Sequence, residues 1–332
     1  MSNKIKYIEF SNNCDEVNIF SQPWWLDVVV GEENWDVVIS EKGGVIQGAL
    51  PYYYVKKGKY LCINQPLLTP RHGIILNYPK NQKKTTKISF ERKVIKELME
   101  KLENLNLDSY NQNFSYNFKN WLPLYWKEFK QTTRYSYIIN KNCDIEEVYN
   151  NIDSSTKNLI RKAEKSVIVK RDISIYDFYK INLMTYSRKN IQIPYSFKLV
   201  EDLDKECEKR NCRKILAGID EQGNIHAAIY IVWDKQYMYY LMGGVNTEFK
   251  ASNATSLLLY NAIQLSKEKR LNFDFEGSMD EGIEKFFSSF GGEQTAYSNI
   301  SKRYRMNLKS ELSRFISNTQ YLKSLLGKIK RR

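Results

Sequence analysis

The sequence predicts an α/β (α+β) protein made of two similar lobes, each a mixed, mostly antiparallel sheet flanked by helices, followed by a basic helical tail. Strand-like and helix-like segments alternate along nearly all of the 332 residues. The order of these segments, with several of the turns between them, recurs in the two halves of the chain. A composition that is 42% hydrophobic and 14% aromatic is sufficient for two packed cores.

The bulk composition narrows the kind of protein and its setting. Only 7 Pro and 15 Gly argue against long disordered or collagen-like regions. The 5 Cys and 2 His lack the spacing of a zinc site, so no metal is predicted, and scattered cysteines in odd number fit a reducing cytosol. The start, MSNKIKYIEF, has no apolar signal core, and no run approaches the ~18 apolar residues of a membrane span. We therefore expect a cytoplasmic protein, at most peripheral at the inner face of the membrane.

The first half begins with a short apolar helix and continues as strands. FSQPWWLDVVV predicts a helix that starts near Pro23. WDVVIS, VIQGALPYYYV and YLCIN follow as strands, separated by glycine-containing turns. Apolar residues at helical spacing predict a helix over 87–105. A strand near 108–116, an aromatic helix near 121–129 and a strand over 134–139 complete this half.

The second half repeats this order of elements. Ile39–Val45 corresponds to Ile219–Ile225, and the helix over 87–105 corresponds to one over 253–269. We interpret this as a tandem duplication of one α/β unit, with a boundary near 140–153. The predicted domains are residues 1–143, residues 144–307 and the tail, residues 308–332.

The most informative stretch is 237–292, which is typical of a strand, a helix, a strand and a helix. Its first strand ends in Gly243-Gly244, and the helix that follows starts among polar residues that can cap it. Free backbone amides at such a strand-to-helix junction favour bound anions. In its second strand, Asp274 and Glu276 alternate with apolar residues and therefore share one face, where a carboxylate could act as a general base.

Three segments resemble the FemAB-like branch of the GNAT acyltransferase superfamily. They are FSQPWWLDVVV, SSTKNLIRKAEKS and TEFKASNATSLLLYNAIQLSKEKRLNFDFEGSMDEGIEKFFSSFGGE. The resemblance implies a tandem GNAT fold and transfer of an acyl or aminoacyl group to an amine. FemAB proteins take aminoacyl groups from tRNA and add them to the peptide of a peptidoglycan precursor, whereas shorter relatives are N-acyltransferases that use acyl-CoA. The sequence departs from CoA-binding members at Phe249–Ala254, which lacks their Arg/Gln-x-x-Gly-x-Gly/Ala pyrophosphate loop.

The resemblance gives the 237–292 stretch a set of expected roles. Asp274 and Glu276 are the expected catalytic bases, with a solvated strand face or a helix-capping pair as the other interpretation. The second lobe is expected to carry the donor site, at the end of its central strand and at the start of the next helix. An ordinary turn at Gly243-Gly244 is the alternative. The expected donor-binding residues are Tyr240, Gly243, Gly244, Lys250, Ser252, Asn253 and Thr255.

Basic residues give the expected acceptor and membrane contacts. Lys157, Arg161 and Lys165 recur every four residues and form one stripe for an anionic acceptor, unless they are only a solvated face. From 302 to 332 there are ten basic residues and one acid, which is +9 of the formal charge of +13. The tail therefore suits an amphipathic helix on an anionic membrane, or one docked on its own domain. His72 and His226 are not expected to support covalent catalysis.

These observations predict an N-acyltransferase that moves an acyl group, from acyl-CoA, to an amine of a bacterial cell-envelope or glycan precursor, as in peptidoglycan or polysaccharide biosynthesis. A FemAB-type enzyme that uses aminoacyl-tRNA is the alternative, because the basic charge suits an RNA partner. A non-catalytic protein that binds RNA or an anionic surface on a decayed GNAT fold is the alternative from another class. The acceptor, the acyl chain length and the oligomeric state are left open.

Overall fold

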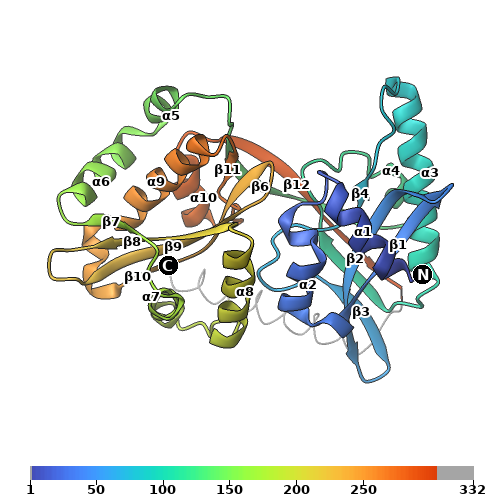
Figure 1. Cartoon of the computed structure of the whole chain (residues 1–332), viewed down its shortest axis with the longest axis horizontal. Coiled ribbons are helices and arrows are strands. Elements are labelled where there is room, and N and C mark those ends of the chain that lie inside the picture. The colour runs from blue at the N-terminus through green and yellow to red at the C-terminus, as the bar shows by residue number, and fades with distance from the viewer. Residues whose placement is uncertain (1, 305–332) are drawn as a thin grey trace, which may run out of the picture.

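The computed structural model describes residues 2–304, so the expected tail at 308–332 lies outside the described residues. A twisted sheet of 12 strands runs through both lobes in the order β1-β2-β3-β5-β12-β6-β11-β10-β9-β8-β7, with β4 paired to β2 (Figure 1). We call residues 2–143 the first lobe and 144–304 the second lobe. No helix in the described part of the chain is long and apolar enough to cross a bilayer.

The first lobe follows the expected order of elements. Its helix α2 begins at Pro23, which stands at N1, where the missing N–H of proline costs no hydrogen bond. The elements are α1 (Asn3–Asn13), η1 (Ile19–Ser21), α2 (Pro23–Val30), η2 (Glu32–Asn34), β1 (Trp35–Lys42), β2 (Val45–Lys57), β3 (Tyr60–Asn64), β4 (Ile75–Leu76), α3 (Lys84–Glu103), β5 (Ser109–Asn113), α4 (Leu122–Tyr125) and β6 (Lys130–Ile139).

Side chains cap the starts of most α-helices of the second lobe. Ser174, Ser196 and Asp280 accept backbone N–H groups at the starts of α7, α8 and α10. The elements are α5 (Ile145–Asn151), α6 (Ser154–Glu164), β7 (Ile168–Arg171), α7 (Ile175–Arg188), α8 (Phe197–Lys209), β8 (Arg213–Ile219), β9 (Ile225–Trp233), β10 (Tyr237–Val245), η3 (Thr247–Ser252), α9 (Ala254–Glu268), β11 (Asn272–Asp274), α10 (Glu281–Ser288) and β12 (Glu293–Arg303).

The strand pairing of the two lobes is equivalent. In the first lobe β1, β2 and β3 are antiparallel and β5 is parallel to β3. In the second lobe β8, β9 and β10 are antiparallel and β11 is parallel to β10. Both leading hairpins also shift register close to their turns, between Ser40 and Glu41 and between Gly218 and Ile219. The predicted architecture of two mixed, mostly antiparallel lobes is thus confirmed.

The last strand of each lobe is exchanged. β6 ends the first lobe but pairs with β11 of the second, and β12 ends the second lobe but pairs with β5 of the first. Between them, Glu293–Ser301 of β12 runs antiparallel to Lys130–Ile138 of β6. Figure 1 shows β12 passing from one lobe into the other. A backbone ladder therefore joins the lobes, and the predicted domain limits at 143 and 307 stay predictions.

The faces of the second-lobe sheet carry different helices. Phe273 of β11 packs with the core under α6, α9 and α10, whereas Tyr239 of β10 packs with the core under α7 and α8. Helix α2 of the first lobe joins this second core through the buried ring of Trp25. The face that carries Tyr239 is consequently the one on which helix α2 of the first lobe packs.

Candidate active site at the junction of the two lobes

A buried ion cluster joins the lobes at the predicted catalytic carboxylates. Arg71, from the loop between β3 and β4, donates from Nη2 to Asp274 Oδ2 at 2.5 Å and to Glu276 Oε1 at 2.9 Å. Its Nη1 donates to Glu276 Oε2 at 3.0 Å, which completes a bidentate pair. The Arg71 side chain is only 2% exposed. The two predicted carboxylates therefore lie together, on one arginine that the sequence did not identify.

Asp274 is fully occupied by this network. Besides Arg71, it accepts from Tyr116 Oη at 3.0 Å and from Ser136 Oγ at 2.7 Å, and it is 0% exposed. Its Oδ1 also accepts the backbone N–H of Glu276 at 2.9 Å. Because all four of these groups donate to it, Asp274 serves as a hydrogen-bond acceptor in this network. It has no solvated face, so that interpretation of the strand is wrong for this residue.

Glu276 lies just beyond β11, in an unusual backbone conformation. Its φ is 62°, and the φ of the next residue, Gly277, is 63°. A left-handed non-glycine residue costs about 1–3 kcal/mol and persists only where its surroundings fix it. Gly277 cannot be replaced freely, because an added Cβ would lie 2.1 Å from the carbonyl oxygen of Tyr135. This turn folds the Glu276 side chain back onto Arg71, with 9% of it exposed.

The cluster has one more acid than base. Burial raises the pKa of Glu276 to about 8, with Arg71 opposing the rise and the Asp274 carboxylate adding to it. Burial would lower the pKa of Arg71, but the two carboxylates raise it well above its ordinary value. The rings of Tyr116, Tyr297 and Tyr239 surround the guanidinium, with centroids 4.2, 5.3 and 5.8 Å from its carbon. A proton on Glu276 would balance the charge, so this carboxyl is suited to exchange one near neutral pH.

This balance predicts a pH dependence of stability that belongs to Glu276. The folded-state pKa is about 8 against an ordinary 4.5, so between these values the folded protein holds a proton that the unfolded chain releases. Raising the pH through that window should destabilise the wild type relative to Glu276→Gln by up to ~1.4 kcal/mol per pH unit. Urea unfolding of both proteins at several pH values measures the difference. Parallel stability curves for the two proteins would contradict the raised pKa.

Helix α7 covers Gly243 and Gly244, which are predicted to bind the acyl donor. Asn182 Nδ2 donates to the carbonyl oxygen of Gly243 at 2.7 Å, and the N–H of Val245 donates to Thr185 Oγ1 at 3.0 Å. An added Cβ on Gly244 would lie 2.4 Å from the carbonyl oxygen of Ile181. The strand therefore contains glycine here so that α7 can approach closely. A donor-binding role for these two residues stays a prediction.

The other predicted donor residues lie around the start of α9. Asn253 adopts φ 58° and donates from its side chain to the carbonyl oxygen of Ala251 at 2.8 Å, without capping α9. Lys250 is exposed, whereas Ser252 and Thr255 are half-buried. Phe249 stacks on His226 at a centroid distance of 4.2 Å. Tyr240 lies earlier, on β10, with its ring against Phe287 of α10.

The predicted acceptor stripe lies on helix α6, away from the ion cluster. α6 packs on the sheet face that carries Phe273, opposite to the face that carries Tyr239. Arg161 and Lys165 are exposed. Lys157 is held locally, since Nζ donates to the carbonyl oxygen of Asn150 at 2.9 Å. The stripe and the carboxylates are therefore not brought together.

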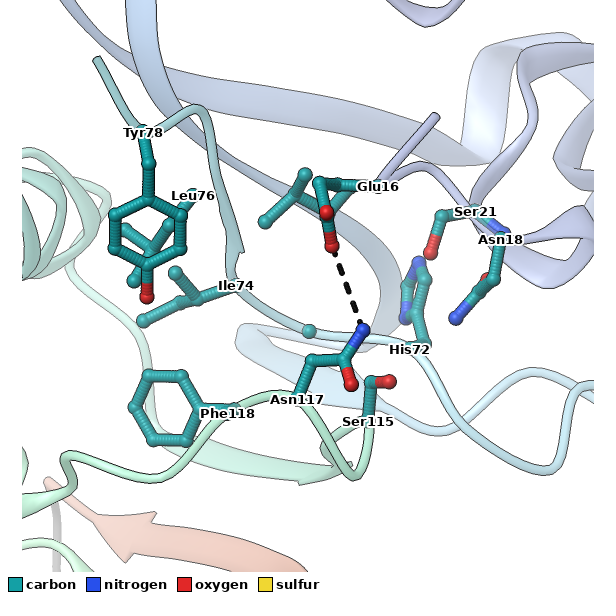
Figure 2. A pocket seen from close by; sticks show the side chains of 12 residues that line it. Glu16, Asn18, Ser21, His72, Ile74, Leu76, Tyr78, Ser115, Asn117 and Phe118 are labelled. Carbon is teal, nitrogen blue, oxygen red and sulfur yellow. Dashed lines mark hydrogen bonds between the residues drawn. The ribbon is translucent and has the colours of Figure 1, made fainter. Parts of the chain in front are cut away.

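Two neighbouring pockets lie near the ion cluster, one between the lobes and one within the first lobe. One is lined by Arg71, Tyr116 and three residues of the β9–β10 region, Asp234, Tyr237 and Tyr239. The other, drawn in Figure 2, is lined by His72, Ile74, Tyr78 and Phe118 among others. Both pockets share the residues Glu16, Asn18, Ser115 and Asn117.

Neither histidine forms a nucleophilic constellation in the part of the chain that the structure describes. Burial lowers the pKa of His72 to about 3, and its Nδ1 lies 2.9 Å from Gln112 Nε2. His226 Nε2 lies 3.0 Å from Asp220 Oδ2. Among residues 2–304 no group of three His, Cys, Asp or Glu side chains could hold a metal ion. The ion cluster is thus the candidate site for chemistry.

Comparisons with known proteins agree with this fold. Residues 150–284 match the family of the Acetyltransferase (GNAT) domain. The solved structure of FemX aligns over 89% of this chain and 95% of its own, with a TM-score of 0.68 and 11% identity. The structure of L-PGS from Bacillus licheniformis aligns over 93% of this chain and 95% of its own, with a TM-score of 0.55 and 11% identity. No curated protein matches the sequence.

Proposed function

Since the chain has a FemAB-like tandem GNAT fold, we propose that it is a transferase that moves an acyl or aminoacyl group to an amine. The observation that carries this proposal is the shared arginine, which holds the carboxyl of Glu276 with a pKa of about 8 and itself lines the pocket between the lobes. A base of this pKa is matched to removing a proton from an amine as it attacks.

The proposed step needs only one proton acceptor. The amine nitrogen attacks the acyl carbonyl, the bond from that carbonyl to the donor sulfur or oxygen breaks, and the nitrogen loses a proton. Glu276 accepts this proton and returns it to the leaving group. Asp274 accepts hydrogen bonds from four groups and is 0% exposed, whereas Glu276 accepts, among the described residues, only from Arg71 and is 9% exposed, so we assign Asp274 a positioning role for Arg71 and Glu276 rather than that of the base.

The donor is proposed to bind where β10 and β11 separate. Residues Tyr237–Tyr239 of β10 pair with Asn272–Asp274 of β11, and β10 then continues to Val245 paired, among the described strands, only with β9. Beyond that point the start of α9, with Lys250, Ser252 and Thr255 nearby, offers amides for a phosphate. The α6 stripe packs beside α9, which supports a role in binding an anionic donor better than an acceptor.

Acyl-CoA is the donor that we propose, with aminoacyl-tRNA as the second candidate. The absence of a glycine-rich loop at Phe249–Ala254 and the charge of +13 favour the second candidate. The acceptor is proposed to be a cell-envelope or glycan precursor met in the cytoplasm or at the membrane surface. A non-catalytic protein that binds RNA or an anionic surface is the competing proposal.

Thermal stability separates these proposals, because a ligand that binds the folded state raises it as the concentration passes Kd. We expect a saturable increase with CoA and acetyl-CoA that ATP and pyrophosphate do not reproduce, followed by transfer to a panel of amines. An increase only with aminoacyl-tRNA would select the second donor. Equal increases with every polyanion, and no transfer, would contradict an enzyme.

A further inference from the structure

The pocket drawn in Figure 2 contains a buried hydrogen-bond donor that lacks a hydrogen-bond acceptor. It lies in the first lobe, between the segment that precedes α2, the His72–Tyr78 segment and the turn after β5, and its volume is about 30 Å³. His72 is 1% exposed, and its Nε2 has no hydrogen-bond partner among the described residues. A buried polar group without a hydrogen-bond partner destabilises the folded protein by about 1–3 kcal/mol, so a hydrogen-bonding partner for His72 Nε2 is expected there.

The proton on His72 can be assigned from its neighbours. Tyr110 Oη donates to Gln112 Oε1, so the amide nitrogen of Gln112 must face the other way. That nitrogen donates to the carbonyl oxygen of Pro51 at 3.2 Å and approaches His72 Nδ1 at 2.9 Å. Nδ1 is therefore the acceptor and, since the imidazole is neutral, Nε2 carries the hydrogen. The pocket consequently offers an N–H to an oxygen atom.

The same pocket has a carboxylate that lacks a cation. Glu16 accepts from Asn117 Nδ2 at 3.4 Å, and no lysine or arginine of residues 2–304 forms an ion pair with it. Its neighbour Asp15 is paired with Lys235 at 2.5 Å. Figure 2 shows Glu16 and Asn117 meeting across the pocket beside the His72 ring. An ammonium group would complete this side.

We infer that this pocket is the subsite for the acceptor, and that the acceptor carries a primary ammonium beside an uncharged oxygen, either an amide carbonyl or a hydroxyl. The ammonium binds Glu16 and Asn117 side by side with the oxygen on His72 Nε2–H, and it loses one proton to Glu16 or to solvent before the neutral amine attacks. The inference rests on the proposed transferase function and names its acceptor class, which differs from the anionic acceptor expected from the α6 stripe. The four residues shared with the neighbouring pocket lead from this subsite to Arg71.

The sequence contains only 2 His, which makes the test direct. Protein labelled with 15N-histidine gives two imidazole signals, and His226 serves as the internal reference. We expect His72 to show the neutral Nε2–H form, and its Nε2 signal to shift with glycinamide or ethanolamine while His226 stays unchanged. Propylamine, which lacks the oxygen, should shift it less. A shift with only one of the two probes identifies the oxygen as carbonyl or hydroxyl.

Variants test each half of the subsite. Because Glu16 is exposed, Glu16→Gln should weaken glycinamide binding only about two- to five-fold. The control Glu9→Gln, at an exposed position on α1, should leave glycinamide binding unchanged. His72→Phe should remove the preference for glycinamide over propylamine, about 5- to 100-fold by calorimetry. If His72→Phe does not fold, the His72 tautomer measured in the wild type and the binding result for Glu16→Gln decide whether the subsite exists.

Binding is measured without turnover, so failure of the transferase proposal leaves these results interpretable. A protonated Nδ1, or a His72 signal that no probe moves, would overturn the subsite even in an active enzyme. Binding that Glu16→Gln leaves unchanged would overturn the ammonium half of it.

Discussion

Glu276→Gln should lower the rate of transfer about 10²- to 10⁴-fold with little change in KM, because glutamine keeps the shape of the side chain but cannot accept a proton. In the wild type, the carboxyl with its pKa of about 8 must be ionised to act, so the rate should rise with pH up to that value. Initial rates measured across pH for both proteins test this, since the variant should lose that rise.

The matched control is Glu281→Gln, an exposed carboxylate at the start of α10, which should leave the rate unchanged. A Glu276→Gln protein that retains the full rate would remove this residue from the chemistry. If Asp274→Asn alone abolished the rate in a folded protein, the assignment of base and positioning residue would have to be exchanged.

Arg71→Met should destabilise the protein by about 3–5 kcal/mol, because it leaves two carboxylates buried without their cation. The control is Arg171→Met, whose pair with Glu268 is more than half exposed at 3.9 Å and should cost less than about 1 kcal/mol. Denaturant unfolding measures both variants. Adding Asp274→Asn and Glu276→Gln to Arg71→Met should recover part of the loss, since the charges are then removed together.

A small effect of Arg71→Met would mean that water or a proton already compensates the cluster. A large effect that the two neutralising substitutions do not reduce would show that packing of the guanidinium among its tyrosine rings, rather than charge, holds the lobes at this point.

The junction couples stability and function in one set of side chains. Arg71 comes from the first lobe, and its partners are 203 and 205 residues further along the chain. The exchanged strands β6 and β12 hold these segments in a common sheet, with Ser136 of β6 donating to Asp274. The candidate base is therefore positioned only when both lobes are folded.

Much of the fold followed from local pattern. The helix near Pro23, the repeated hairpins and the alternation of Asp274 and Glu276 with apolar residues are all set by the period of side-chain directions within one element. The two carboxylates do lie together, but only Asp274 is on the strand, because Glu276 follows β11 in a left-handed turn that brings its side chain onto Arg71. The resemblance to the FemAB-like fold also rested on such contiguous segments.

Arg71 could not be found in this way. Its only signal is an arginine and a histidine inside the otherwise apolar run LLTPRHGIIL, and nothing in that run identifies its partners. For the same reason the sequence could not show that the α6 stripe, predicted to bind the acceptor, is separated from the carboxylates by the sheet. The alternative interpretation of Gly243 and Gly244 as an ordinary turn likewise did not anticipate that helix α7 packs against them.

The sequence by itself determined the elements, their duplication and the pair of acidic residues, because these depend on interactions within a few residues along the chain. Only the tertiary structure decided which strands are exchanged, which carboxylate is saturated and which keeps a raised pKa, and where His72 and Glu16 meet. Those properties depend on burial and on partners brought from distant segments, and burial is what turns an ordinary carboxyl into one that exchanges a proton near neutral pH.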